Sequence, residues 1–342
     1  MGQKKIRTAL IGLGRLGKRY AAMLRDQLPA ADLVAACSIV PEEREYARTQ
    51  LGLEAVFADS AEMLRTVAPE VLFVISSTDQ HAAHMVQGLE AGCHVFCEKP
   101  LSVSVAECER IEALAAAHPG QLAVVGFNRR FDPSYAYAKA QIDAGVIGKP
   151  FRVHSQTVDK DSVADFQIEY LKNSGGIFHD FNVHDIDLAR WFLGSEIRTV
   201  FAVGGAYKYP AFAAQGDADN VLTTCVLENG ALATIVASRT AMHGHDTYTE
   251  VVGTEGTLRI GRPAARNRVE IYDRHGVRQE CVETFYERFE AAFFLQAQDF
   301  FDCIMQGREP LLRLRDATEA TRAAEAFTVS FVEKRLVEVL RG

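Results

Sequence analysis

At 342 residues the chain is longer than one typical domain and predicts two, each large enough for its own core. Its 48% hydrophobic and 24% charged residues are typical of a soluble globular protein, and a formal net charge of −8 argues against a nucleic-acid partner, because phosphate binding needs a basic face. No apolar run reaches the roughly 18 residues of a membrane span, so we expect no membrane partner.

A buried strand and a glycine-rich turn open the chain. The strand is predicted from Ile6 to Gly12, and a helical pattern continues to about Leu28. The turn between them contains Gly12, Leu13, Gly14, Arg15, Leu16 and Gly17. In a Gly-x-Gly-x-x-Gly turn the first glycine allows the tight bend, the second admits a pyrophosphate, and the third lets the helix pack on the strand. The sequence therefore predicts a dinucleotide site formed by these six residues.

The second strand, Leu33 to Ile39, is where an acidic residue that grips the ribose hydroxyls of NAD is expected. Ser38 occupies that position and carries no charge to repel a 2′-phosphate. No arginine follows directly to bind such a phosphate, and Arg44 is the nearest; Glu42 or Glu43 could approach the ribose. We predict NAD as the cofactor, with NADP left open.

Strand and helix patterns alternate as far as Phe127. Strands are predicted at 55–57, 71–75, 94–97 and 122–127, and helices at 60–67, 82–91 and 105–117. This alternation predicts a parallel, doubly wound Rossmann sheet. Polar residues directly after the strand at 71–75 are expected at the cofactor: Ser76, Ser77, Thr78 and His81. Thr78 and His81 could equally cap the following helix.

Glu98, Lys99 and Pro100 follow the strand at 94–97. Proline has no amide hydrogen, so the chain must turn where Lys99 emerges. A lysine there can point into the crevice at the carboxyl ends of parallel strands, the usual ligand position in such sheets. We predict that Glu98 and Lys99 contact the cofactor and that Lys99 also contacts the substrate.

Seven cysteines are scattered along the chain, and none forms a Cys-x-x-Cys pair. This set suits a reducing compartment, so a cytoplasmic protein is expected. Cys93, His94 and Cys97 are close enough to raise a metal site, but no second cluster accompanies them. We interpret them as packing residues and expect no metal.

The pattern becomes β-rich after Pro150. Strands are predicted at 151–159, 200–208, 221–227, 231–240, 247–252, 257–260 and 269–272, and helices near 180–193, 289–306 and 316–340. This predicts an α/β domain with a large open, mainly antiparallel sheet, one face covered by helices and the other meeting a partner subunit. We place a dinucleotide-binding domain at residues 1–127 and a substrate-binding and oligomerisation domain at 128–342, whose last helix can pack back on the first domain.

A second polar constellation follows the glycine pair Gly175-Gly176. Asp180 and His184 are four residues apart and share a helix face beside apolar positions. A neutral histidine can take a hydroxyl proton, and a neighbouring carboxylate can orient it. With Lys99 stabilising a developing alkoxide, these residues predict oxidation of a secondary alcohol with hydride transfer to nicotinamide. The alternative is a helix-capping aspartate and an unrelated surface histidine.

These three motifs, in this order, resemble the glucose-fructose oxidoreductase and inositol dehydrogenase family over essentially the whole chain. Segments 95–101, 126–132 and 147–150 look most like the bacterial inositol 2-dehydrogenases within it. The resemblance implies a Rossmann domain plus an open-sheet domain, a tetramer or dimer assembled through that sheet, and a cis peptide before Pro100. It also implies catalytic roles for Lys99, Asp180 and His184.

The resemblance further implies a substrate site. Arg129 matches an arginine near the polyol, Phe285 matches an aromatic that flanks substrate, and His243 and His245 fall where inositol dehydrogenases can carry tyrosines. The substrate contacts so implied are Lys99, Asn128, Arg129, Asp180, His184, His243, His245 and Phe285. The two histidines and Asn128 leave the exact polyol open.

The implied activity is NAD(P)-dependent oxidation of a ring hydroxyl of myo- or scyllo-inositol to the ketone. A dehydrogenase of a pyranose sugar or sugar derivative is the alternative within the family. A NAD-dependent glycosidase or lyase and a non-catalytic, cofactor-binding regulator are further alternatives. A regulator has no need of Lys99, Asp180 and His184 together, which favours an enzyme.

Overall fold

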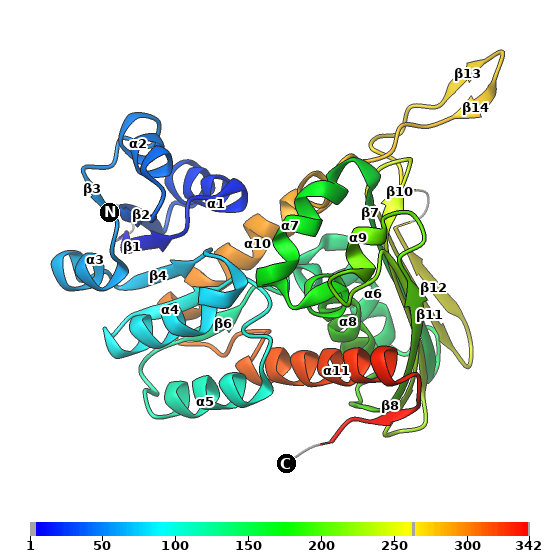
Figure 1. The fold of residues 1–342 in the computed structure, drawn as a ribbon. Helices are drawn as coiled ribbons and strands as arrows, with labels where there is room; N and C mark the ends of the chain where they lie inside the picture. Colours follow the sequence, from blue (N-terminus) through cyan, green and yellow to red (C-terminus); the bar gives the residue numbers. More distant parts are fainter. Residues whose placement is uncertain (1–4, 262–263, 341–342) are drawn as a thin grey trace. The chain divides into compact units, whose positions relative to one another are not determined.

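The computed structural model describes residues 5–261 and 264–340 (Figure 1). Its internal contacts divide the chain into two compact units. The first contains Met1–Phe127 and Phe294–Thr318, and the second contains Asn128–Phe293 and Glu319–Gly342. The chain therefore leaves the first unit after β6 (Ala123–Val125), and returns to it through the second half of α10 (Phe285–Gln306).

The first unit is built on a six-stranded sheet with the order β3-β2-β1-β4-β5-β6. All its strand pairs are parallel, so the predicted doubly wound sheet is confirmed. The strands are β1 (Ile6–Ile11), β2 (Ala31–Cys37), β3 (Ala55–Phe57), β4 (Val71–Val74), β5 (His94–Cys97) and β6 (Ala123–Val125). The helices are α1 (Arg15–Asp26), α2 (Pro41–Thr49), α3 (Ser60–Val67), α4 (Thr78–Glu90) and α5 (Val105–Ala116).

An aromatic cluster forms the core beneath β4 and β5. The Phe73 and Phe96 rings stack with centroids 4.8 Å apart, and Phe300 meets both edge-on at 5.9 Å. Phe301 stacks on Phe73 at 6.1 Å. These buried contacts explain why the second half of α10 belongs to the first unit, since aromatic side chains dominate core energetics.

Two helices of this unit differ from the sequence prediction. α4 begins at Thr78 and not at Ala82, because Ser77 has the extended backbone of an N-cap and Asp79 lies in the first turn. Thr78 and His81 therefore lie within the first turns of the helix, whose N-cap is Ser77. Helix α2 was not predicted, although Pro41 at its first position is a recognisable helix start.

The second unit is built on a seven-stranded mixed sheet with the order β12-β11-β7-β10-β9-β8-β15. Its strands are β7 (Pro150–Lys160), β8 (Ile197–Gly205), β9 (Asn220–Leu227), β10 (Leu232–Ala241), β11 (Asp246–Gly253), β12 (Thr257–Ile260) and β15 (Val337–Glu338). Helices α6 (Pro133–Asp143), α7 (Ala164–Ser174) and α8 (Val183–Leu193) lie on one face of this sheet (Figure 1). The short elements of this part of the chain are η1 (Asn128–Phe131), η2 (Asp161–Val163), η3 (Phe178–Asn182) and α9 (Pro210–Ala213). The long helix α11 spans Leu314–Glu333.

The sheet is mainly antiparallel, as predicted, but its central pair β7–β10 is parallel. Two local predictions were wrong. Residues 269–272 do not join the sheet; Ile271–Asp273 (β13) pairs only with Gly276–Arg278 (β14), in a hairpin that projects from the sheet with Tyr272 73% exposed (Figure 1). The last helix does not reach Leu340, because Lys334 has a left-handed backbone (φ 53°) and the chain then pairs with β8.

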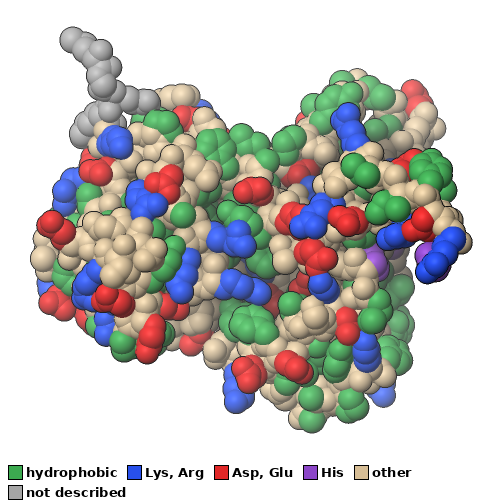
Figure 2. Space-filling view, turned by 90° about the horizontal axis from the view of Figure 1, so that it is seen from above, with side chains coloured by type: hydrophobic (Ala, Val, Ile, Leu, Met, Phe, Trp, Pro, Cys, Tyr) green, Lys and Arg blue, Asp and Glu red, His purple; other side chains and the backbone are tan. Residues whose placement is uncertain are grey.

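Charged side chains are distributed without separation by sign on the face drawn in Figure 2, where Lys and Arg alternate with Asp and Glu. Within the described part of the chain, no helix is both long and apolar enough to cross a membrane. None of the seven cysteines is in a disulfide.

Candidate functional site

The glycine turn between β1 and α1 provides an open backbone surface. Gly12 has a φ of 92°, and a Cβ atom there would lie 2.4 Å from the Ile75 carbonyl oxygen. A Cβ on Gly17 would lie 1.9 Å from the Gly12 oxygen. Both clashes require glycine, whereas the nearest atom to a Cβ on Gly14, the N-cap of α1, would be 3.8 Å away. The turn thus leaves the start of α1 accessible to the phosphates of a dinucleotide, as the motif predicts.

Ser38 follows β2 and is buried. Its hydroxyl donates a 2.5 Å hydrogen bond to Oε2 of Glu43, which lies in the first turn of α2. Arg44, on the same helix, donates from Nη1 to the Ser38 carbonyl oxygen at 2.7 Å. The structure therefore places a carboxylate beside the position where the sequence lacks one.

The turn that carries Lys99 is stabilised by the buried carboxylate of Glu98. Glu98 accepts a 2.6 Å hydrogen bond from the Tyr20 hydroxyl and a 3.0 Å bond from the Lys99 backbone amide. Gln296 donates to the Tyr20 oxygen at 2.7 Å. Burial raises the pKa of Glu98, while the Tyr20 bond and the Lys99 charge oppose this shift. The Lys99–Pro100 peptide is cis, as the resemblance implies. Glu98 is thus placed to hold the turn, and Tyr20 and Gln296 are supports that the sequence analysis missed.

His81 connects this turn to the end of β4. Its Nδ1 lies 2.7 Å from the Pro100 carbonyl oxygen and its Nε2 lies 3.0 Å from the Ser76 carbonyl oxygen. Burial lowers the pKa of His81, and nearby Lys99 lowers it further. With 2% of its surface exposed, His81 is placed to fasten two backbone segments together, and Thr78 beside it is also buried.

In the second unit, Asp180 and His184 stand at the junction of two helices. Asp180 lies in η3, a π-helical turn, and His184 is the second residue of α8. Over the described residues 177–190, every side chain is buried except these two, which are half-buried. The predicted regular helix from Asp180 is therefore wrong in its first turn, but the pair is the accessible part of this segment. π-helical turns occur frequently at functional sites.

The segment is anchored from its buried side. Phe178 packs edge-on against Phe327 of α11, with ring centroids 5.8 Å apart. The Ile177 amide donates to Asp217 at 3.1 Å, and Gly175 and Gly176 both have positive φ. These contacts fix the start of the π-helical turn, which explains the glycine pair in the sequence.

Asp185, next to His184, is the centre of a fully buried polar network. It accepts hydrogen bonds from Arg129 Nη1 at 2.8 Å and from the Ser155 and Thr157 hydroxyls at 2.7 Å each. The Arg129 guanidinium, 2% exposed, also donates to Thr157 at 2.6 Å. Arg129 is thus held in an internal ion pair that joins η1, α8 and β7. The sequence analysis assigned Arg129 to the substrate and missed Asp185. The signal that could have paired the two segments is the arginine pair at 129–130 together with the two aspartates at 185 and 187.

Arg130 makes the companion pair. Its Nε and Nη2 donate to the two oxygens of Asp187 at 2.9 and 2.5 Å, with both side chains buried. Its guanidinium lies over the Trp191 ring, 5.5 Å from the centroid. Asn128, which precedes the two arginines in η1, is likewise buried. Both pairs tie η1 to α8, and the Asp185 network also ties α8 to β7.

The carboxyl ends of the parallel strands β7 and β10 carry further polar residues. His245 is 3% exposed, with Nδ1 3.3 Å from Asp159 Oδ1 and with Nε2 buried and unpartnered among the described residues. Gln167 donates to the other Asp159 oxygen at 2.7 Å. The Phe285 ring is 6.4 Å from the His245 ring. His243 is instead exposed at the surface, 3.4 Å from Asp246.

The π-helical turn lies at this same end of the sheet. η3 contacts β10, and the Arg239 guanidinium lies 5.3 Å from the centroid of the Phe181 ring. The unit thus brings Asp180 and His184 to the end of the sheet that holds Asp159 and His245.

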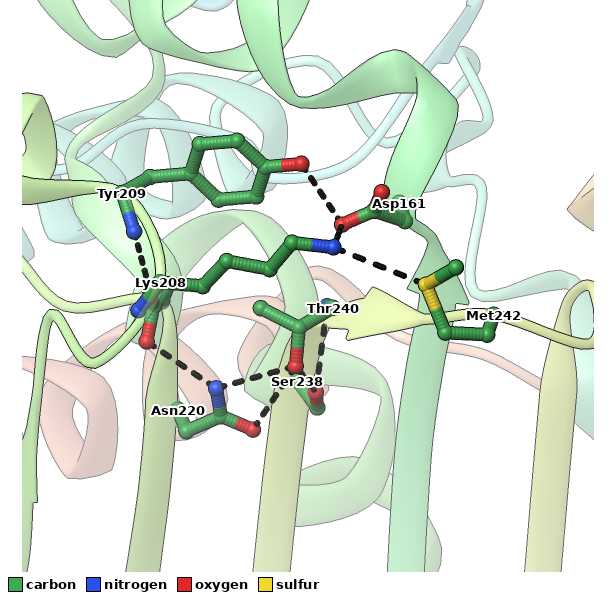
Figure 3. A network of polar contacts seen from close by, with 8 residues as sticks. Asp161, Lys208, Tyr209, Asn220, Ser238, Thr240 and Met242 are labelled. Carbon is green, nitrogen blue, oxygen red and sulfur yellow. Dashed lines mark hydrogen bonds and ion pairs between the residues drawn. The ribbon is translucent and has the colours of Figure 1, made fainter.

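A loop borders this end (Figure 3). It includes Lys208, which the sequence analysis placed in a strand at 200–208, whereas β8 ends at Gly205. Lys208 Nζ donates to Asp161 at 2.7 Å and lies 3.5 Å from the Met242 sulfur, and the Tyr209 hydroxyl donates to the same Asp161 oxygen at 2.6 Å. Asn220 bonds Thr240 beneath them at 3.1 Å. The Lys208 bond lowers the pKa of Asp161. These hydrogen bonds attach the loop to η2, the short helix that directly follows β7.

No group of three or more His, Cys, Asp or Glu side chains is arranged to hold a metal in the described ranges. Cys93 and Cys97 are buried, and the Cys93 thiol lies 3.2 Å from the Pro69 carbonyl oxygen.

A doubly wound parallel sheet with an open glycine turn after its first strand defines a dinucleotide-binding domain. Residues 6–127 match the model of an oxidoreductase family with an NAD-binding Rossmann fold, and residues 135–259 match the GFO/IDH/MocA C-terminal domain. The chain belongs to this GFO/IDH/MocA family of NAD-dependent oxidoreductases.

Two curated relatives extend over nearly the whole chain. The scyllo-inositol 2-dehydrogenase (NAD(+)) of Bacillus subtilis is 36% identical, with 96% of this chain and 95% of the relative covered. The myo-inositol 2-dehydrogenase of Thermotoga maritima is 31% identical, with 98% of each covered. The crystal structure of scyllo-inositol dehydrogenase from Lactobacillus casei with bound NAD(H) and scyllo-inositol has a TM-score of 0.95 at 35% identity, covering 98% of this chain and 99% of that one.

Proposed function

We propose that this protein oxidises a secondary ring hydroxyl of myo- or scyllo-inositol to the ketone. One observation carries the proposal: Asp180 and His184 are the two side chains of residues 177–190 that are not buried, on a segment held rigid from below by Asp185. The names of the relatives supply the substrate class.

We assign the roles as follows. Bound NAD supplies the hydride acceptor. His184 accepts the hydroxyl proton, and Asp180 orients the imidazole for that transfer. The Lys99 ammonium stabilises the negative charge that develops on the oxygen as the proton leaves. The first unit binds the cofactor, and the second supplies most contacts with the polyol.

On the substrate side, we propose that His245 is a polyol contact. Its Nε2 is a buried polar atom without a partner among the residues that the structure describes, and Asp159 orients the ring from the other nitrogen. A substrate hydroxyl would satisfy Nε2, and Phe285 would supply an apolar wall. The arrangement differs from the tyrosines that the resemblance implies, which is why a pyranose sugar remains the second candidate substrate.

The test is an initial-rate assay of NAD and NADP reduction with myo-inositol, scyllo-inositol, D-glucose, L-glucose and D-xylose. We expect kcat/KM to be highest for one of the inositols. A higher value for any of the aldoses would move the assignment to a pyranose dehydrogenase. Absence of turnover with all five, with the cofactor bound, would contradict both.

We further infer that the protein forms a homodimer or homotetramer through the helix-free face of the second unit's sheet. Outward-facing apolar side chains on neighbouring strands support this: Phe201, Val203, Leu222 and Leu232 are 37 to 47% exposed. Val203 and Leu222 are directly paired across β8 and β9. Contiguous exposed apolar residues of this kind are typical of interfaces. We also propose a cytoplasmic location, supported by seven cysteines that remain free thiols.

A further inference from the structure

The cofactor site contains a carboxylate that does not come from the end of β2. In NAD-binding sheets of this type, an acidic residue at that point accepts hydrogen bonds from the 2′- and 3′-hydroxyls of the adenosine ribose. This chain has Ser38 there, followed by Ile39 and Val40. The structure shows where a replacement carboxylate is found.

Helix α2 begins at Pro41, only three residues beyond Ser38, so its first turn folds back over the strand end. Glu43 is the third residue of this helix and is half-buried, whereas its neighbour Glu42 is exposed. The Ser38 oxygen accepts a 3.1 Å bond from the Val40 amide. Its single hydrogen is therefore directed to Glu43 Oε2, 2.5 Å away. Ser38 acts as the residue that positions the Glu43 carboxylate.

The second oxygen of that carboxylate faces the glycine turn. Oε1 of Glu43 is the nearest atom to the Cβ position of Gly14, at 3.8 Å. Glu43 thus lies between the end of β2 and the turn that receives the pyrophosphate, which is the place of the adenosine ribose in this fold. Ile39, 84% exposed on the same loop, offers an apolar surface for the adenine ring.

We propose that Glu43, positioned by Ser38, binds the adenosine ribose and makes this protein selective for NAD over NADP. Its free oxygen accepts the ribose hydroxyls, and its negative charge repels a 2′-phosphate. Arg44, the neighbouring cation, donates a hydrogen bond to the Ser38 carbonyl oxygen. The proposal rests on the cofactor site alone, not on which polyol is oxidised.

The test measures the dissociation constants of NADH and NADPH for the full chain without substrate, by nucleotide fluorescence. We expect the wild-type protein to bind NADH more tightly. In Glu43→Gln, the ratio of the NADPH to the NADH constant should fall about tenfold or more, because a charged hydrogen bond to the ribose is lost and a repulsion is removed. Glu42→Gln removes the same charge one residue away and should leave the ratio unchanged.

Three further variants separate positioning from folding. Ser38→Ala should shift the ratio in the same direction but less, and Ser38→Thr, which keeps the hydroxyl, should restore it. Glu43→Asp keeps the charge on a shorter arm, so it should weaken NADH binding while still discriminating against NADPH. An unchanged ratio in Glu43→Gln, an equal shift in Glu42→Gln, or equal weakening of both nucleotides would overturn the proposal. Because substrate is absent, these outcomes do not depend on the polyol assignment.

Discussion

His184 is half-buried, whereas its neighbour Asp185 is wholly internal. One residue therefore is available for chemistry, and the next holds the backbone in place. A general base needs this arrangement, because proton transfer requires that the histidine ring be held within hydrogen-bond reach of the substrate.

Replacing His184 with alanine should lower kcat roughly 100-fold or more, because general base catalysis contributes about that factor. Cofactor affinity should be nearly unchanged, since the cofactor is assigned to the other unit. The measurements are kcat with an inositol and the NADH dissociation constant. His275→Ala, on the exposed β13–β14 turn, is the control and should retain full activity. Unchanged kcat in His184→Ala would remove this residue from the mechanism.

His179 predicts an acid sensitivity of the second unit. Burial lowers the pKa of His179 to about 4, and its Nδ1 lies 3.1 Å from the Gly175 carbonyl oxygen. Between pH 6.5 and about 4 the unfolded chain binds a proton at this residue that the folded state does not, so stability falls as the pH falls. The contribution approaches about 1.4 kcal/mol per pH unit within that window.

Thermal unfolding midpoints measured from pH 7 to 4.5 test this. His179→Asn keeps a donor for Gly175 but has no titrating ring, so its midpoint should decrease less steeply with acidification than that of the wild-type protein. Identical slopes would show that His179 titrates alike in the folded and unfolded states.

The junction of η3 and α8 shows how an irregular element is held by regular ones. A π-helical turn lacks the regular hydrogen-bond register of an α-helix. Here it is enclosed by the strand β10, by Phe327 of α11, and by the network that ties α8 to β7. The accessible pair at the turn therefore owes its position to three other elements.

Asp185→Asn should destabilise the second unit by about 3 to 5 kcal/mol, because Arg129 is left as a buried charge without its partner. Urea denaturation measures the loss. The matched control is Asp273→Asn, which removes an aspartate from the exposed pair with Arg278 and should shift the midpoint little. Equal effects of the two substitutions would mean that the Arg129 pair contributes no more than a surface ion pair.

The exposed apolar residues on the sheet of the second unit predict that the protein self-associates through this face. Leu222→Glu places a charge at the centre of the exposed apolar strip, so it should convert the oligomer to smaller species. Sedimentation velocity measures the change. Val103→Glu, a partly exposed position in the first unit, is the control and should leave the assembly intact. An unchanged sedimentation coefficient in Leu222→Glu would exclude this face as the interface.

Much of the first unit could be predicted from the sequence because its signals are local. The glycine turn, the alternating strands and helices, and the turn at Lys99 are each defined within about ten residues, and short parallel units of this type have few alternative topologies. The helix α2 was missed for a local reason as well, since its first turn follows so closely on β2.

In the second unit, the sequence by itself determined that a β-rich domain follows Pro150, and it predicted that Asp180 and His184 act as a pair. Only the tertiary structure decided that β7 and β10 are parallel and that Arg129 is paired with Asp185. In the first unit, it likewise decided that the Glu43 carboxylate lies against the Ser38 hydroxyl. The physical reason is range: periodicity and turn chemistry act between near neighbours, whereas the partner of a buried charge is chosen by which distant segment the packed core brings within hydrogen-bond distance.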